Sequence, residues 1–510
     1  MTTFKHLLPA LLLVSMTMGR FAATEAAALP KSDPERQGVS STAILNFINA
    51  ADEHVNDIHS FILLRHGKRI AEAWWNPYQQ NTAHMLFSLS KSFTSTAVGL
   101  AIAEGHLTLD APIISFFPDE APEDPSWQLK SMRVQDLLSM STGHDSKDLR
   151  DFSFEAETPL TELFLHLPVA HKPGTHFLYN TPATYMCSAI IQKVTGSNLA
   201  DYLQTRLFKP LGIENPDWSK SSQGIAHGGY GLNITTGDIA RLGQLYLQEG
   251  VWEGRQLLSE SWVKEATSRQ TSTGSNPQND WDQGYGYQFW RCRNNAYRGD
   301  GAFGQFCIVM PEQDAVIAIT SGTSDMQGIL NLVWDHLLPA MSTNALAQDS
   351  ANHQKLTKRL QALQIKTVQS NVTDAQRIRW LGKTFQLEDN DLGFKKISVS
   401  KTTRGEHKVQ ITTLGGIHDF LCRGSIWKND ETSLPIGIAS RRPYRAVHPM
   451  ATTGAWTTEN QFQFRVAYTE TPLVLSFHLD YDMEQVSLDV THSAAFGLRK
   501  LPSIIGNIQP

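Results

Sequence analysis

A serine followed three residues later by a lysine is the first arrangement in this chain that could do chemistry. On a helix, residues i and i+3 share one face, so the amine can take the proton of the hydroxyl and make it a nucleophile. The sequence contains four such pairs, which are Ser88/Lys91, Ser261/Lys264, Ser398/Lys401 and Ser425/Lys428. At least three of them must be accidental, so the surroundings of each pair have to decide.

The surroundings favour the first pair. Ser398 and Ser425 lie in a β-rich tail, where residues i and i+3 point to opposite faces of a strand. Ser261 opens an amphipathic helix and is expected to cap it. Ser88 begins a strongly apolar helix, predicted over 88–104, in which the lysine would be partly buried. Burial favours the neutral amine that a base requires, but a helix cap beside a solvated lysine fits the residues equally well.

Further motifs accompany this pair in a fixed order. They are MLFSLSKSF (85–93), GHLTLD (105–110), VQDLLSMSTG (134–143), FLYNT (177–181), GYGL (229–232), TGDIAR (236–241) and YGY (285–287). With these motifs, residues 31–345 resemble the serine β-lactamase and penicillin-binding-protein superfamily. The most similar branch is the class C-like one, with its DD-peptidases, esterases and 6-aminohexanoate-dimer hydrolases.

The resemblance implies a fold, an activity and a role for each matching residue. The fold is α/β, with a β-lactamase-like antiparallel sheet flanked by helices and an all-α insertion. The activity is that of a serine hydrolase, with Ser88 as the acylated nucleophile and Lys91 as its base. The backbone N–H groups of Ser88 and Ala302 would form the oxyanion hole. Tyr179 would shuttle protons through a phenolate-like oxygen, for which it needs a nearby cation such as Lys91. Taken alone, Tyr179 fits a packing residue better.

The substrate-binding positions depart from the family pattern at two places. These positions are Thr181, Arg298, Asp300 and Gly301. Thr181 stands where the motif has asparagine, with Asn180 one place early. The third motif, which usually carries Lys or His, reads Gly-Asp-Gly at 299–301. Because that cation helps hold the carboxylate of a penicillin, its loss predicts weak β-lactam turnover. Asp300 is either a structural turn residue or a selector for an amine-bearing substrate.

Composition and length bound the remaining possibilities. The 510 residues are 41% hydrophobic and 18% charged, which is ordinary for a soluble globular chain of two or three domains. The net charge of −6 and the lack of a long basic run exclude a nucleic-acid-binding protein. We therefore expect a small-molecule or peptide substrate, and the oligomeric state stays open.

Changes of pattern divide the chain into four segments. Residues 1–28 have a basic start, an apolar stretch and an Ala-x-Ala site, which is typical of a secretory signal peptide; an uncleaved anchor or a buried helix is the alternative. The mature protein is then exported, periplasmic or secreted, and not stably inserted in a membrane. A hydrolase domain is expected at 29–345 and a linker helix at 346–375. Alternating segments predict an antiparallel β-domain at 376–510.

Cysteines and histidines are the remaining reactive residues. Cys292 and Cys307 flank a glycine-rich turn and could form a cross-strand disulfide, although two unpaired buried thiols fit equally well. His166, His171 and His176 lack a metal-ligand spacing, so neither a metal nor another cofactor is expected.

The sequence leaves two alternative functions open. One is a non-catalytic sensor that binds peptidoglycan or D-amino-acid peptides, which would have no need of the Ser/Lys/Tyr set. The other is a metal hydrolase, which a chelator would inhibit.

Overall fold

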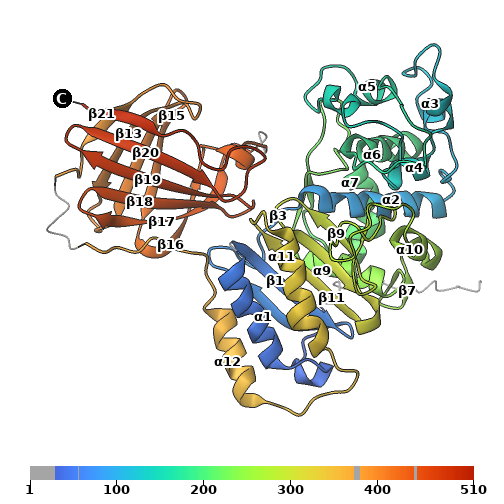
Figure 1. Ribbon diagram of the computed structural model, residues 1–510, viewed down its shortest axis with the longest axis horizontal. Coiled ribbons are helices and arrows are strands. Elements are labelled where there is room, and N and C mark those ends of the chain that lie inside the picture. The colour runs from blue at the N-terminus through green and yellow to red at the C-terminus, as the bar shows by residue number, and fades with distance from the viewer. Residues whose placement is uncertain (1–28, 56, 373–378, 442–444, 510) are drawn as a thin grey trace, which may run out of the picture.

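The chain folds into a mixed α/β part and a C-terminal β-sheet part (Figure 1). The computed structural model describes residues 29–55, 57–372, 379–441 and 445–509. The predicted signal peptide, 1–28, lies outside these residues. Within the described ranges, no helix is both long and apolar enough to cross a membrane.

A six-stranded antiparallel sheet forms the centre of the α/β part. Its order is β2 (Lys68–Trp74), β1 (Ile58–Arg65), β11 (Ala315–Ser321), β10 (Gln305–Met310), β9 (Tyr297–Gly301) and β8 (Trp290–Arg291). Strands from the two ends of the region therefore meet in one sheet, as the sequence predicts. Every residue of β1, β10 and β11 is buried, because helices cover both faces.

The two faces of the sheet have separate apolar cores. Phe61 and Leu63 pack on one side, and their neighbours Ile62 and Leu64 pack on the other. The first side is covered by α1 (Ser41–His54), α11 (Met326–Leu332) and α12 (Ser350–Gln361). The second is covered by α2 (Ser90–Ala103) and α9 (Thr236–Leu247). This arrangement holds α2, the helix that follows Ser88, against the centre of the domain.

The helical insertion predicted between the strands is present. Its helices are α3 (Trp127–Ser131), α4 (Val134–Leu138), α5 (Leu160–Leu165), α6 (Thr181–Thr195), α7 (Leu199–Leu203), α8 (Lys209–Leu211) and α10 (Glu260–Thr267). Short strands accompany them: β3 (His84–Met85), β4 (Asp217–Trp218), β5 (Leu232–Ile234), β6 (Val251–Trp252) and β7 (Arg255–Gln256). Helix α6 packs on α2 and α4, which brings the residues before α6 close to the start of α2. The predicted α/β fold class is thus confirmed.

The C-terminal part is a single ten-stranded antiparallel sheet. Its order is β15 (Gly416–Cys422), β14 (His407–Thr413), β13 (Phe394–Lys401), β12 (Thr384–Leu387), β21 (Ile504–Ile508), β20 (Gln485–His492), β19 (Val474–Asp482), β18 (Gln461–Tyr468), β17 (His448–Thr458) and β16 (Gly424–Thr432). The edge strands β15 and β16 are separated by one residue and contact each other, so the sheet curls into a barrel-like body. Alternating buried residues fill its interior. The antiparallel β-domain is confirmed, whereas the four segment boundaries stay a proposal.

The turn between β18 and β19 joins the two parts. The N–H of Met85 donates to the carbonyl of Glu470 at 2.9 Å, and the Tyr78 hydroxyl donates to the carbonyl of Thr471 at 3.2 Å. A Cβ atom on Gly322 would lie 2.3 Å from the carbonyl oxygen of Pro472, so the approach requires glycine at that position. The C-terminal part is therefore fixed close to the segment that leads into Ser88.

The predicted disulfide between Cys292 and Cys307 is wrong. All four cysteines lie in the described part of the chain and are free, buried thiols. Cys292 belongs to the core on the α1 side, where its sulfur accepts from Arg298 Nη1 at 3.1 Å. Cys307 belongs to the opposite core, where its thiol faces the Ile239 carbonyl of α9 at 3.4 Å. The two sulfurs thus lie on opposite faces of the sheet.

Candidate active site

Ser88 lies in a tight turn between β3 and α2. The residue before it, Phe87, has φ 48°, a left-handed conformation that is uncommon for an aromatic residue. A short 3₁₀ segment over Phe87–Leu89 follows, so the α-helix begins at Ser90 rather than at Ser88 as predicted. The Ser90 hydroxyl donates to the Phe87 carbonyl at 2.7 Å and accepts from the Leu232 N–H at 3.1 Å. These bonds fix the turn that presents Ser88.

Lys91 lies one turn into this segment and is almost completely buried, with 1% of its surface exposed. Its Nζ donates to Ser88 Oγ at 3.1 Å, to Thr181 Oγ1 at 3.3 Å and to the Gly229 carbonyl at 2.7 Å. Burial lowers the pKa of Lys91 to about 7, while the negative charge of Asp300 opposes that decrease. Near neutral pH a large fraction of Lys91 is therefore the free amine that can accept the Ser88 proton.

The other Ser-x-x-Lys pairs have different surroundings. Lys264 is 60% exposed and pairs with Glu260, and the serine that caps α10 is Ser259, not Ser261 as predicted. The remaining two pairs lie on strands β13 and β16, where the serine and the lysine point to opposite faces. The buried geometry that a proton transfer requires is thus found at Ser88 and Lys91.

Tyr179 packs beside the same two residues. Lys91 Nζ lies 4.9 Å from the centroid of its ring, and Trp290 stacks on the ring at 5.7 Å. Burial and the charge of Asp300 raise the pKa of Tyr179, and a hydrogen bond with the Ser88 side chain offsets only part of this rise. Tyr179 is therefore a neutral phenol at neutral pH. Burial, and after it the charge of Asp300, therefore disfavours the expected phenolate, and the role of Tyr179 in proton transfer stays a prediction.

Thr181 and Asn180 each have one of the roles expected of a single asparagine. Asn180 is fully buried and caps α6 by accepting from the Ala183 N–H at 3.1 Å. Its amide also donates to Thr142 Oγ1 at 3.1 Å. Thr181, by contrast, turns its hydroxyl toward Lys91. The residue at the expected asparagine position thus reaches the site, and its neighbour holds the loop.

Arg298 and Asp300 form a buried ion pair at the edge of the site. Arg298 is fully buried, and its Nε and Nη2 both lie 2.9 Å from Asp300 Oδ2. Asp300 lies in β9 opposite Phe306, so the interpretation as a turn residue is wrong. Burial raises the pKa of Asp300, while Arg298 and Lys91 act against this. Because its guanidinium is occupied by protein groups, Arg298 positions Asp300 rather than facing the space near Ser88.

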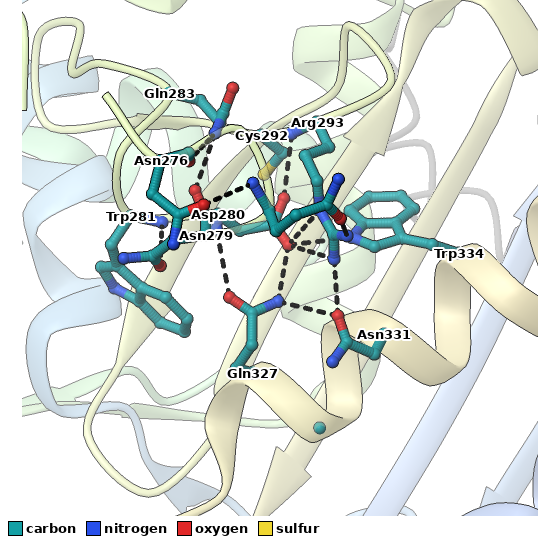
Figure 2. Close-up of polar contacts among 12 residues, drawn as sticks. Asn276, Asn279, Asp280, Trp281, Gln283, Cys292, Arg293, Gln327, Asn331 and Trp334 are labelled. Carbon is teal, nitrogen blue, oxygen red and sulfur yellow. Dashed lines mark hydrogen bonds and ion pairs between the residues drawn. The ribbon is translucent and has the colours of Figure 1, made fainter. Parts of the chain in front are cut away.

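The backbone of Asp280 holds Arg298, while the buried carboxylate of Asp280 has partners of its own. The carbonyl of Asp280 accepts from Arg298 Nη1 at 2.9 Å. Figure 2 shows the Asp280 carboxylate receiving hydrogen bonds from Arg293, Gln327 and Trp334, at 2.7 to 3.0 Å. Burial raises the pKa of Asp280, but these hydrogen bonds prevail and hold it below its usual value. The network links α11 and the segment after it to Asp300.

Glycines let β9 lie directly against the Ser88 turn. A Cβ on Gly301 would be 2.0 Å from the Leu86 carbonyl oxygen, and one on Gly299 would be 2.4 Å from Ser92 Oγ. Ala302 follows as the second residue of a turn closed by the Gly304 N–H and the Gly301 carbonyl, at 3.2 Å. Gly301, the residue before Ala302, is thus packed against the backbone on both sides of Ser88, at Leu86 and Leu89. Ser88 and Ala302 are the two positions expected to donate to an oxyanion.

Among the described residues, one group has the geometry to hold a metal ion. Asp145, His171 and His176 place one potential ligand atom each within 4.8 Å of one another. His171 Nε2 already contacts Asp145 Oδ1 at 2.7 Å, and the histidine rings lie 4.4 Å apart. An ion pair between partly exposed side chains accounts for this arrangement. The group therefore gives no reason to add a metal to the chemistry of Ser88.

Comparison with known proteins places this geometry in a family. The family model described as Beta-lactamase matches residues 55–330, which is more than half of the chain. The chain belongs to the β-lactamase family. It is therefore a serine hydrolase by class, and the sheet, the helical insertion and the Ser88 turn all lie within the matched residues or at their borders.

Individual relatives within this family are distant. The 6-aminohexanoate-dimer hydrolase of Paenarthrobacter ureafaciens is 26% identical over 294 residues, covering 52% of this chain and 73% of the relative. Esterase EstB of Burkholderia gladioli is 24% identical, covering 31% of this chain and 44% of its own length. The solved structure of EstCE1, a hydrolase with promiscuous acyltransferase activity, aligns with a TM-score of 0.50 at 15% identity, over 58% of this chain and 99% of that one. The structural likeness supports the β-lactamase-family fold.

Two functional residues are not identified by sequence reasoning. Gly229 supplies the carbonyl that accepts from Lys91, and a Cβ there would be 2.7 Å from Thr181 Cγ2. Trp290 stacks on Tyr179 and hydrogen-bonds with Asp300. The GYGL motif at 229–232 marks the first position without revealing its role. No sequence signal distinguishes Trp290 from a core tryptophan.

Proposed function

We propose that this β-lactamase-family protein is an exported hydrolase that forms an acyl-enzyme on Ser88 with ester or amide substrates. The observation that carries the proposal is the buried Lys91 amine, 3.1 Å from Ser88 Oγ and with a pKa of about 7. A buried, near-neutral lysine beside a serine hydroxyl has little value for stability but is well suited to accept a proton.

Acylation begins when neutral Lys91 accepts the Ser88 proton while Oγ attacks the substrate carbonyl carbon. The carbonyl electron pair moves to oxygen, where the N–H groups of Ser88 and Ala302 stabilise the negative charge. The intermediate collapses and expels the alcohol or amine, which receives the proton from Lys91 through the Tyr179 hydroxyl. Water then attacks the acyl-enzyme by the same proton path, and release of the acid restores Ser88.

Tyr179 acts in this scheme as a neutral relay. Its hydroxyl hydrogen-bonds with Ser88, and its raised pKa means that it can pass a proton on without holding a lasting negative charge. Thr181 and the Gly229 carbonyl keep the Lys91 amine directed at the nucleophile. The positions proposed for substrate contact are Thr181, Asp300 and Gly301, with Arg298 acting through Asp300.

The proposed substrates are small esters and amides, with weak activity on β-lactams. Relatives of the chain include, by name, a 6-aminohexanoate-dimer hydrolase and an esterase. A penicillin carboxylate would meet Asp300 where penicillin-recognising relatives have a cation, and like charges disfavour binding. An acyl-transfer site with an unfavourable charge toward β-lactams fits ester and amide hydrolysis best.

Intact-mass measurement after incubation with a fluorophosphonate tests the proposal. The protein should gain the mass of one phosphonyl group, and Ser88→Ala should lose both this adduct and the hydrolysis of p-nitrophenyl acetate. Ser261→Ala is the matched control, because it removes a serine from an exposed pair with the same spacing. Labelling of Ser88→Ala would mean that another residue is the nucleophile. An unmodified protein that neither labels nor hydrolyses esters would leave a binding or sensor role instead.

We also propose that residues 1–28 are removed on export and that the hydrolase domain spans 29–345 and the C-terminal domain 376–510. The linking segment 346–375 contains α12 (Ser350–Gln361), so its helix is shorter than predicted and packs on α1 of the hydrolase domain. N-terminal sequencing of protein recovered from the periplasm or the medium should give a start near Leu29. Recovery of protein with an intact N-terminus from the cell interior would contradict the export proposal.

A further inference from the structure

Three phenylalanine rings from both parts of the chain meet beside the Ser88 turn. Phe87 and Phe303 lie 5.5 Å apart between ring centroids. Phe496 joins them from the C-terminal domain, 5.7 Å from Phe87 and 4.8 Å from Phe303. All three pairs have tilted or edge-to-face geometry, which aromatic rings prefer.

The sequence positions of these rings connect them to the reaction. Phe87 directly precedes Ser88, and Phe303 directly follows Ala302. Two of the rings therefore belong to residues next in sequence to the proposed nucleophile and to the second proposed oxyanion donor. Phe87 and Phe303 are 5% and 8% exposed, whereas Phe496 is 59% exposed. The cluster thus extends from the two catalytic backbone segments to solvent, and Phe496 forms its accessible side.

The loop that carries Phe496 is held at its base. The His492 N–H donates to the Arg499 carbonyl at 2.7 Å, and Thr491 and Lys500 form a β-bridge just outside this pair. The Ser493 hydroxyl donates to the Pro472 carbonyl at 3.2 Å, inside the turn that joins the two parts. The same loop leaves a second apolar side chain, Leu498, 72% exposed.

A second attachment fixes the position of this loop relative to Ser88. The turn after β18 receives the Met85 N–H at the Glu470 carbonyl, three residues before the nucleophile. Arg445 pairs with Glu470 at 2.9 Å and steadies the same turn. Backbone contacts at the base of the loop and at the joining turn therefore fix the position of Phe496, in addition to the contacts of its ring.

We propose that Phe496 of the C-terminal domain forms one wall of the acyl-binding subsite, and that this wall selects substrates with an extended apolar acyl group. The inference rests on the proposed acyl-enzyme function and names its substrate class. An acyl group bound to Ser88 lies beside Phe87 and Phe303, and a chain of several methylenes reaches the exposed ring. Each methylene transferred from water to such a surface favours binding, so long acyl groups gain more than acetyl.

The test compares p-nitrophenyl acetate with p-nitrophenyl octanoate, which share a leaving group and differ in acyl length. In Phe496→Ala, kcat/KM for the octanoate should fall about three- to tenfold relative to the acetate. Phe496→Leu keeps an apolar side chain and should recover most of the difference. Met483→Ala is the control. Met483 is an apolar residue that is 75% exposed, and it lies at the turn between β19 and β20. This turn is at the opposite end of β19 from the joining turn, so the substitution should not change the ratio.

The experiment distinguishes failure of the proposed subsite from failure of the proposed catalytic function. Fluorophosphonate titration of each variant gives the fraction of competent Ser88. An unchanged octanoate-to-acetate ratio, or an equal loss for both esters, with full labelling overturns the role of Phe496. An unmodified protein that fails to label overturns the proposed catalytic function instead, whatever the ratio.

Discussion

The carboxylate of Asp300 opposes the effect of burial on the amine of Lys91. Burial alone lowers the pKa of Lys91, and the nearby negative charge raises it, so the balance lies at about 7. The same carboxylate is held by Arg298 and thus has a fixed position. Asp300 therefore adjusts the basicity of the catalytic amine in addition to any contact with substrate.

This relationship predicts the pH dependence of catalysis. Because neutral Lys91 is the proposed base, kcat/KM should rise with pH through an apparent pKa of about 7. Asp300→Asn removes the charge that raises the Lys91 pKa, so the acid limb should move to lower pH. A pH–rate profile with p-nitrophenyl acetate measures both curves. Because Asp300→Asn leaves the Arg298 guanidinium without its ion-pair partner, the double variant Arg298→Met/Asp300→Asn serves as the check. An acid limb that stays in place or moves upward in both variants contradicts the role of Asp300.

Removal of the Tyr179 hydroxyl tests the proton relay. Tyr179→Phe keeps the ring between Lys91 and Trp290 and removes the oxygen that hydrogen-bonds with Ser88. We expect kcat to fall about 100-fold or more, the usual range for a lost acid–base group, with little change in melting temperature. Pre-steady-state kinetics would then show which of acylation and deacylation is slowed. If turnover is unchanged, Lys91 alone moves the proton and Tyr179 is a packing residue.

Lys91 should reduce the stability of the folded protein. Its pKa is lower in the folded chain than the 10.5 of an exposed lysine, so folding disfavours the protonated form. The cost is complete below about pH 7 and disappears as the pH rises toward 10.5. Lys91→Met should abolish activity and yet increase the free energy of unfolding by about 1–4 kcal/mol at about pH 6, with a smaller gain at about pH 9. Urea unfolding at the two pH values measures this, and a destabilised variant at the lower pH would contradict the prediction.

Substrate preference should depend on the charge at residue 300. The unmodified protein should hydrolyse p-nitrophenyl esters with a higher kcat/KM than nitrocefin. Asp300→Thr removes the carboxylate that would repel the carboxylate of a β-lactam. Nitrocefin turnover should therefore improve relative to ester turnover. The carboxylate argument fails if the unmodified protein already prefers nitrocefin, or if the ratio does not move in Asp300→Thr.

The contact between the two parts should contribute to stability. In Gly322→Ala, the new Cβ would lie 2.3 Å from the Pro472 carbonyl oxygen and 3.2 Å from the His59 ring. Relief requires the joining turn to move, so we expect a loss of about 1–3 kcal/mol together with reduced esterase activity. Gly415→Ala is the matched control, since its Cβ would meet its nearest neighbour at an ordinary 3.6 Å. Thermal unfolding of both variants measures the difference, and equal melting temperatures would refute it.

Elements with a strong apolar pattern are the part of the fold that the sequence predicts well. The strands around 58–65 and 305–321, the insertion helices and the β-rich tail all follow from periodicity over several residues. Boundaries that depend on a single backbone torsion do not follow from it. The start of α2 is at Ser90 rather than Ser88 because a 3₁₀ segment over Phe87–Leu89, which begins at the left-handed Phe87, precedes the α-helix.

The sequence predicts the part of the site that lies within one local segment. It does not predict the parts at which distant segments meet. Ser88 and Lys91 lie within one turn of chain, and their relationship follows from spacing. The Cys292–Cys307 pairing fails because proximity in a hairpin does not determine which face of the sheet a thiol occupies. The Arg298–Asp300 pair and the Trp290 stack depend on tertiary packing. No periodic pattern in the sequence carries that information.

The hydrogen bond from Met85 to Glu470 also has a consequence for biosynthesis. Translation delivers Ser88 long before Glu470, so the nascent hydrolase domain lacks the acceptor that secures its nucleophile turn until β18 and the turn after it have been made. Phe496 is added later still. We therefore expect a ribosome-bound or truncated polypeptide that lacks these residues to carry an unfinished nucleophile turn, and the proposed esterase activity to arise only after Glu470 and Phe496 have been made.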